Sequence, residues 1–130
     1  MKLYETYDYK GQGYQKLFHF KSWRIAELKY IQEIDASPVN FLECHLESDE
    51  VFILLEGDCN MWLFTDNKPD SSFEFITLNK NEIYRIPQGI YHAHRLSKDA
   101  KILIIEEDST NDKNSHRIYL NEIQIEKARR

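Results

Sequence analysis

The sequence predicts an all-β domain built as an antiparallel sandwich or barrel. About ten short segments of strand length are separated by turn-forming residues. Aromatic residues are plentiful, with eight Tyr, seven Phe and two Trp, which suits a β-rich core around a ligand-sized interior. The 130 residues are expected to form a single domain, long enough to bury about two thirds of the unfolded surface around one core.

Secondary structure is harder to predict in the first forty residues than in the rest of the chain. Residues 1–16 are polar and Tyr-rich, so we expect an irregular arm or a short edge strand, followed by a brief apolar alternation at 17–20. Trp23 to Tyr30 contains good helix formers, but its apolar residues are spread over both faces, so helix and strand both remain open. Residues 31–40 form a polar connector that carries Pro38.

The later segments alternate more clearly between apolar strands and polar turns. The turns are marked by Gly57-Asp58, by the loop 65–72, by 79–81 and by the charged loop 107–115. A last strand, followed by a short tail that packs on a neighbour, is expected at 117–125. The remaining expected strands are 41–46, 50–56, 60–65, 73–78, 83–86, 92–96 and 101–106.

Two blocks carry residues of the types that bind metal ions. Glu43 and His45 are two residues apart on an expected strand, so their side chains leave the same face. A short polar turn then leads to Glu50 at the start of an apolar run. About thirty residues later, a turn at 87–89 delivers His92 to the start of another strand.

These two blocks resemble the two motifs of the cupin superfamily. The first motif usually reads Gly-x5-His-x-His-x(3,4)-Glu-x6-Gly, and its positions are occupied here by Ser37, Glu43, His45, Glu50 and Gly57. The second reads Gly-x5-Pro-x-Gly-x2-His-x3-Asn, and its positions are occupied by Asn81, Pro87, Gly89, His92 and Leu96. Both opening glycines, the first His and the final Asn are therefore replaced, and Glu43 exchanges a nitrogen ligand for an oxygen.

The resemblance covers roughly residues 22–107 and implies a single-domain jelly-roll barrel, the double-stranded β-helix of cupins, with the site inside it. It leaves an N-terminal arm at 1–21 and a C-terminal strand and tail at 108–130. It also implies that Trp23 to Tyr30 is the first barrel strand and that the protein is a homodimer. The chain looks like a small single-domain cupin of a poorly characterised group.

The expected metal ligands are Glu43, His45, Glu50 and His92, which offer two nitrogen and two oxygen donors. Such a set fits a divalent Zn, Fe, Mn, Ni or Co ion. Without Glu43, the remaining two His and one Glu have the composition of a facial triad with open positions. In the alternative interpretation the barrel is metal-free, and Glu43 points to solvent or pairs with a cation.

Four other residues in or near the motifs are considered as site residues. His94 shares a strand face with His92, so it could donate a hydrogen bond to a metal ligand, act as an acid/base group, substitute for the missing His ligand or be an ordinary pocket residue. Tyr84 could present its phenol to the pocket or be a core residue. Arg24 could be a surface charge or an anion-binding residue at the pocket mouth. Cys44 should face away from its neighbours and is not expected to be a nucleophile.

Composition excludes several partner classes. The net charge of −5 and the lack of a basic cluster outside the tail 126–130 argue against nucleic acid. The two cysteines, Cys44 and Cys59, are too few for a disulfide framework and are expected as free thiols. No apolar run reaches the length of a signal peptide or membrane span, so we expect a cytoplasmic protein with no membrane partner.

Two functions remain open from the sequence. The first is a divalent-metal-dependent enzyme that acts on a small polar substrate such as a sugar or organic acid, with His94 or Tyr84 moving a proton. The second is a non-catalytic module that binds or senses a small molecule, with or without metal. The cupin fold alone does not choose between them, because one fold supports many reactions.

Overall fold

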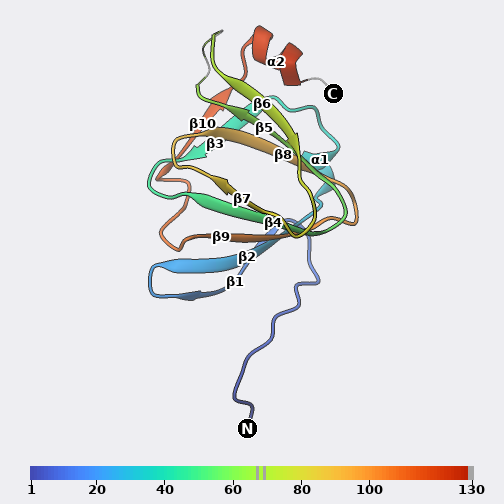
Figure 1. Cartoon of the computed structure of the whole chain (residues 1–130), viewed down its shortest axis with the longest axis vertical. Helices are drawn as coiled ribbons and strands as arrows, with labels where there is room; N and C mark the ends of the chain where they lie inside the picture. The colour runs from blue at the N-terminus through green and yellow to red at the C-terminus, as the bar shows by residue number, and fades with distance from the viewer. Residues whose placement is uncertain (67, 69, 129–130) are drawn as a thin grey trace.

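The computed structural model describes residues 1–66, 68 and 70–128, and it shows two antiparallel sheets with two short helices (Figure 1). The helices are α1 (Gln32–Asp35) and α2 (Glu122–Ala128). The strands are β1 (Tyr14–Phe20), β2 (Trp23–Lys29), β3 (Phe41–His45), β4 (Glu50–Glu56), β5 (Cys59–Phe64), β6 (Phe73–Thr77), β7 (Ile83–Ile86), β8 (Tyr91–Leu96), β9 (Lys101–Glu107) and β10 (Ser115–Tyr119). No helix in this part of the chain combines the length and the apolar character needed to cross a membrane.

The first sheet has the strand order β1-β2-β9-β4-β7, and the second has the order β10-β3-β8-β5-β6. Neighbours far apart in sequence pair in both sheets, as β2 does with β9 and β3 with β8. This arrangement confirms the predicted all-β jelly roll. Trp23–Lys29 is a strand, as the resemblance implied: Ala26 and Leu28 join the core, whereas Trp23 on the other face is exposed.

The core lies between the two sheets. Its buried residues come from β2, β4 and β9 of the first sheet and from β5 and β8 of the second, with Phe52, Met61 and Ile102 among the most deeply buried. The polar site described below is built at one end of this interior, because β3, β4 and β8 also direct polar side chains into it. Buried apolar contacts of this kind stabilise by roughly 25 cal/mol per Å² of apolar surface removed from water.

A second hydrophobic cluster covers the outer face of the β10-β3-β8-β5-β6 sheet. Alternation along β8 separates the two environments: His92 faces inward, whereas Ala93 belongs to this outer cluster. The other buried members of the cluster are Val39, Leu42, Trp62, Phe64, Leu120 and Ala128. The barrel therefore has apolar side chains on both faces of one sheet.

The C-terminal segment differs from its prediction. A last strand does form, as β10, but the following residues form α2 instead of a tail that packs on a neighbour. The helix packs on its own chain, since Ala128 joins the outer cluster and the buried Gln124 donates from Nε2 to the carbonyl of Asp66 at 2.8 Å. The prediction was wrong because that outer face is apolar and has to be covered. Residues 129 and 130 of the basic tail lie outside the described residues.

Candidate metal site

Three side chains from separate strands converge inside the barrel. His45 ends β3, Glu50 begins β4 and His92 is the second residue of β8. The Glu50 Oε1 atom lies 3.3 Å from Nε2 of His45 and 3.2 Å from Nε2 of His92. One potential ligand atom from each residue lies within 4.8 Å of the other two. The sequence prediction that two imidazoles and a carboxylate meet here agrees with this placement.

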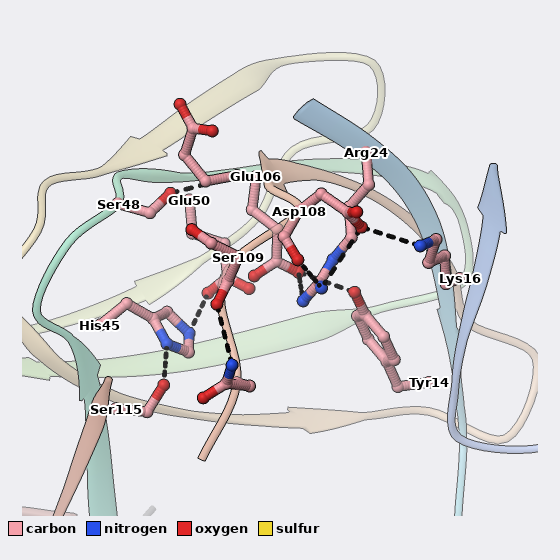
Figure 2. A network of polar contacts seen from close by, with 12 residues as sticks. Tyr14, Lys16, Arg24, His45, Ser48, Glu50, Glu106, Asp108, Ser109 and Ser115 are labelled. Atoms are coloured by element: carbon pink, nitrogen blue, oxygen red, sulfur yellow. Dashed lines mark hydrogen bonds and ion pairs between the residues drawn. The ribbon is translucent and has the colours of Figure 1, made fainter. Parts of the chain in front are cut away.

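The other ring nitrogens are held by contacts outside the cluster. Nδ1 of His92 lies 3.2 Å from the carbonyl oxygen of Ile90, which can only accept, so Nδ1 is the donor in this contact and Nε2 is the ring nitrogen that faces the cluster. Nδ1 of His45 is hydrogen-bonded to Oγ of Ser115 at 2.8 Å, on the neighbouring strand β10 (Figure 2). Partners of this kind set the tautomer and ring orientation of metal-binding histidines.

The electrostatics of the cluster centre on the Glu50 carboxylate. Burial opposes ionisation of Glu50, yet the contacts with His45 and His92 outweigh it and hold the Glu50 pKa well below its usual range. Burial likewise disfavours the charged form of His45, but Glu50 raises the His45 pKa above its ordinary value. Glu50 Oε1 is buried and accepts no hydrogen bond of acceptable geometry from the described residues. A buried carboxylate oxygen that faces the Nε2 atoms of two imidazoles matches the donor set of a divalent ion.

Glu43 is the expected ligand that the structure does not bring into the cluster. It lies opposite His92 in the pairing of β3 with β8 and lines the same pocket. Its carboxylate, however, pairs with Arg117 at 3.4 Å, and a third of its side chain is exposed. Arg117 stands directly across from Glu43 on β10. This matches the alternative in which Glu43 pairs with a cation.

His94 also enters the pocket, on the same face of β8 as His92. Burial, with a smaller contribution from His92, lowers the His94 pKa to about 4, so the ring is neutral at pH 7. Its Nδ1 atom is buried and has no hydrogen-bond partner among the described residues. His94 is therefore a polar group of the pocket wall, outside the three-residue cluster.

The pocket itself has a volume of about 300 Å³ and a second polar wall opposite the histidines. Figure 2 shows Arg24, Glu106 and Tyr14 together on this wall. Arg24 lies 3.2 Å from the Glu106 carboxylate, to which the Tyr14 hydroxyl donates at 2.8 Å. Burial, followed by the nearby charge of Glu50, raises the Glu106 pKa. Only 13% of the Arg24 side chain is exposed, so the surface-charge reading of Arg24 was wrong.

Sequence reasoning missed Glu106 and Tyr14. The signal for Glu106 was its position at the end of a buried-strand run, where a carboxylate directly follows four apolar residues. Tyr14 gave no comparable signal, because it lies in a stretch with several other tyrosines. Both reach the pocket only through the pairing of β1, β2 and β9.

Tyr84 is placed away from the pocket. Its hydroxyl accepts a hydrogen bond from the backbone N–H of Asn79 at 2.8 Å, and its ring packs against the apolar core. It is absent from the residues that line the cavity around His45 and His92. The reading of Tyr84 as a core residue with a satisfied hydroxyl fits the structure, and the reading as a pocket phenol does not.

Solved structures resemble this fold. A cupin-2 domain containing protein from Shewanella frigidimarina is 26% identical, with 76% of this chain and 84% of that chain covered and a TM-score of 0.55. A TDP-quinovose 3,4-ketoisomerase from Campylobacter jejuni is 20% identical, with 78% and 72% covered and a TM-score of 0.52. Oxalate decarboxylase from Bacillus subtilis is 14% identical, with 75% of this chain but 24% of that chain covered and a TM-score of 0.53. Comparisons with family models and with curated proteins find no match.

Proposed function

The chain has the fold of the cupin superfamily, and from this premise we propose that it is a metalloprotein that acts on a small polar molecule inside its barrel. His45, Glu50 and His92 would hold a divalent ion, one of Zn, Fe, Mn or Ni. When bound, the ion would supply Lewis-acid chemistry, polarising a carbonyl or hydroxyl group.

One observation carries this proposal. Both imidazoles direct Nε2 toward the same buried carboxylate oxygen, while their Nδ1 atoms are held by Ser115 and by the Ile90 carbonyl. A purely structural His–Glu–His cluster would be expected to satisfy the Glu50 oxygen with a well-formed hydrogen bond. Here that oxygen remains without one among the described residues.

The chain's own side chains define how a substrate would be held. His94 presents a neutral ring to the pocket, and its buried Nδ1 atom has no hydrogen-bond partner among the described residues. In this proposal that atom would exchange a hydrogen bond or a proton with a substrate hydroxyl. Glu106 and Arg24 face the same space from the first sheet. The pocket volume of about 300 Å³ suits a molecule of monosaccharide size. The solved neighbours named as a sugar ketoisomerase and as oxalate decarboxylase support a sugar or organic acid as the substrate class.

A second candidate is a non-catalytic binding or sensing module. It is favoured by the pairing of Glu43 with Arg117, which leaves three ligands in the cluster instead of four. A three-ligand site holds its ion less tightly, and the same pocket could bind a small molecule without any ion.

Metal content separates the two candidates. Protein purified without a His-tag should carry close to one equivalent of a divalent metal, and His45→Ala and His92→Ala should each lose it. His19→Ala is the matched control, because His19 is half-exposed on β1 and should leave the metal content unchanged. Protein that contains no metal and binds none on addition of Zn, Fe, Mn or Ni salts would overturn the proposal and leave the metal-free binder.

Turnover is the second measurement. Metal-loaded protein is incubated with a panel of aldoses, ketoses and small organic acids, and products are followed by NMR. Conversion that disappears in His45→Ala supports an enzyme. Binding of a panel member without conversion supports the sensing module.

A further inference from the structure

A second cavity lies on the outer face of the β10-β3-β8-β5-β6 sheet, away from the metal site. Its volume is about 620 Å³, and we call it the outer groove. It is bounded by the end of α1 and the following residues 36–39, by β5 and β8, and by α2. Strand β8 separates the two sites, because His92 faces the barrel interior whereas Arg95 lines the outer groove.

Trp62 provides the first sign that this groove binds a ligand. The residue is 5% exposed, and its indole Nε1 atom is buried without a hydrogen-bond acceptor in the part of the chain that the structure describes. A buried donor left unsatisfied loses its hydrogen bond to water without a replacement, so native proteins rarely leave one unpaired. Beside Trp62 on the same strand, Asn60 accepts at Oδ1 from the Thr77 hydroxyl, which leaves its amide N–H groups for a ligand.

Arg95 provides a positive charge in the same groove. Three of its N–H groups donate to backbone carbonyls, at 3.0 Å to Ser37, 2.7 Å to His94 and 3.3 Å to Pro38. A guanidinium has five N–H donors, so two remain. No carboxylate oxygen among the described residues lies within 4.0 Å of it. Burial lowers the Arg95 pKa, which shows that its positive charge is held in an unfavourable environment.

Asp35 does not remove this excess of donors. It lines the groove and partly offsets the charge of Arg95. Both of its carboxylate oxygens, however, already accept backbone hydrogen bonds, from Leu96 at 2.7 Å and from Ile31 at 2.8 Å. The groove therefore offers N–H donors from an indole, an amide and a guanidinium, while its one carboxylate is engaged by the backbone.

Apart from Ser37, whose hydroxyl donates to the Glu33 carbonyl, the rest of the lining is apolar. Val39 is buried, Ile125 of α2 is half-buried, and Pro38 and Ala128 complete the wall. A purely inorganic anion would leave these surfaces in contact with water. A ligand that has both an anionic group and an apolar body would use the whole groove.

We propose that the outer groove binds a small organic carboxylate, whose oxygens accept from Arg95 and Trp62 and whose apolar body lies against Val39 and Ile125. This site is independent of the metal site and does not depend on the function proposed for it. Cyclohexanecarboxylate is a suitable probe, and cyclohexylmethanol, which has the same ring without the charge, is its matched control.

The indole N–H of Trp62 gives a direct readout. Protein labelled with ¹⁵N-tryptophan should show two indole signals, because the chain contains two tryptophans, and Trp23→Phe assigns them. Titration with cyclohexanecarboxylate should move the Trp62 indole proton downfield in a saturable way, because it gains an acceptor. The Trp23 signal should stay in place, and cyclohexylmethanol should bind at least about tenfold more weakly.

Variants test the charge. Arg95→Met should abolish the saturable shift, and Arg95→Lys should keep part of it. Arg85→Met is the control, because Arg85 is an exposed arginine on β7 that pairs with Asp49. If Arg95→Met disturbs the fold, the wild-type comparison of the two probes decides alone. An unmoved Trp62 signal, or equal affinity for the acid and the alcohol, would overturn the proposal.

Discussion

The ring orientations of His45 and His92 are held by hydrogen bonds to groups outside the three-residue cluster. The Ile90 carbonyl lies two residues before His92 on the chain, whereas Ser115 is brought to His45 from seventy residues away. The first contact is local and robust to most substitutions. The second depends on a single hydroxyl, so it can be removed without disturbing the metal ligands themselves.

Ser115→Ala should therefore weaken metal binding without abolishing it. Loss of the partner at Nδ1 leaves the His45 ring free to rotate and to adopt the other tautomer, and we expect an affinity about 10–100-fold lower. Competition with a chromophoric chelator measures the change. Ser109→Ala is the control, since Ser109 is exposed in the preceding loop and makes its described hydrogen bonds through its backbone carbonyl. Equal affinity of Ser115→Ala and wild type would contradict the role assigned to this contact.

Cys59 shows how burial changes chemistry at a residue outside both sites. Burial, together with the charge of Asp35, raises the Cys59 pKa to about 12 from an ordinary value of 9.0. At pH 8 the thiolate fraction should be about a thousandfold smaller than that of an unperturbed thiol. In a Cys44→Ala background, Cys59 should react slowly with a disulfide reagent in the native state and rapidly in denaturant. Fast reaction of native protein would contradict this.

The raised pKa of Cys59 also makes the stability of the fold depend on pH. The folded state holds the Cys59 proton more tightly than the unfolded state does, so the stabilisation is fully present below pH 9 and declines as the pH rises from 9 toward 12. Cys59→Ala should unfold with a weaker dependence on pH across this window. Unfolding in guanidinium at pH 8, 9 and 10 measures it.

At the level of elements, alternation along the strands assigns side chains to the two sites. On β8, even-numbered residues face the barrel interior and odd-numbered residues face the outer side of the sheet, as His92 and Arg95 show. On β5, Met61 belongs to the core and Trp62 to the outer cluster. A slip of one residue in either strand would exchange the faces and destroy both sites.

The turn between β4 and β5 maintains this register through Gly57. Its φ is +74°, and a Cβ atom there would lie 2.6 Å from Cα of Ala100. Gly89 also has a positive φ, +82°, but a Cβ at that position would meet nothing within 4 Å. Alanine at position 89 would therefore incur only the cost of the left-handed backbone conformation. Alanine at position 57 would incur that cost and the cost of a steric clash as well.

Gly89→Ala should lower the free energy of unfolding by about 1–2 kcal/mol, the cost of the left-handed conformation alone. Gly57→Ala should lose a further ~1–3 kcal/mol, because the Ala100 backbone cannot move aside cheaply. Chemical denaturation of both variants measures the difference. Equal losses would show that the β4–β5 turn can relax away from Ala100.

At the scale of the whole molecule, the metal site links ligand binding to folding. Its ligands come from three strands in both sheets, so the ion can bind only when the barrel has closed. Binding to the folded state alone stabilises it by about 4 kcal/mol when the free metal is at a thousandfold excess over Kd.

Removal of the metal should consequently lower the melting temperature. For a domain of this size we expect a shift on the order of 10 °C between metal-loaded and chelator-treated protein. His45→Ala should melt at the same temperature with and without chelator, whereas His19→Ala should retain the full difference. A chelator effect that persists in His45→Ala would indicate an ion bound elsewhere.

Much of this architecture could be predicted from the sequence. The strands from 41 to 107 were predicted within one or two residues of their observed bounds, because alternation and turn residues are local signals. The placement of His45, Glu50 and His92 in one cluster also agrees with the prediction. The sequence did not predict the helix α2 or the ion pairs of Glu43 and Arg24, because each of these depends on residues far away in the chain.

Between residues 41 and 107 the sequence by itself determined which segments are strands and which side chains each strand sends to either face, since both follow from the two-residue period of an extended backbone. Only the tertiary structure decided which charges meet. Glu43 pairs with Arg117 on β10 and stays outside the cluster, and Arg24 pairs with Glu106 on β9 in the pocket wall. The outer groove likewise exists only because α2 folds back over the second sheet. Contacts between strands far apart in sequence depend on sheet order and register, which no single segment specifies.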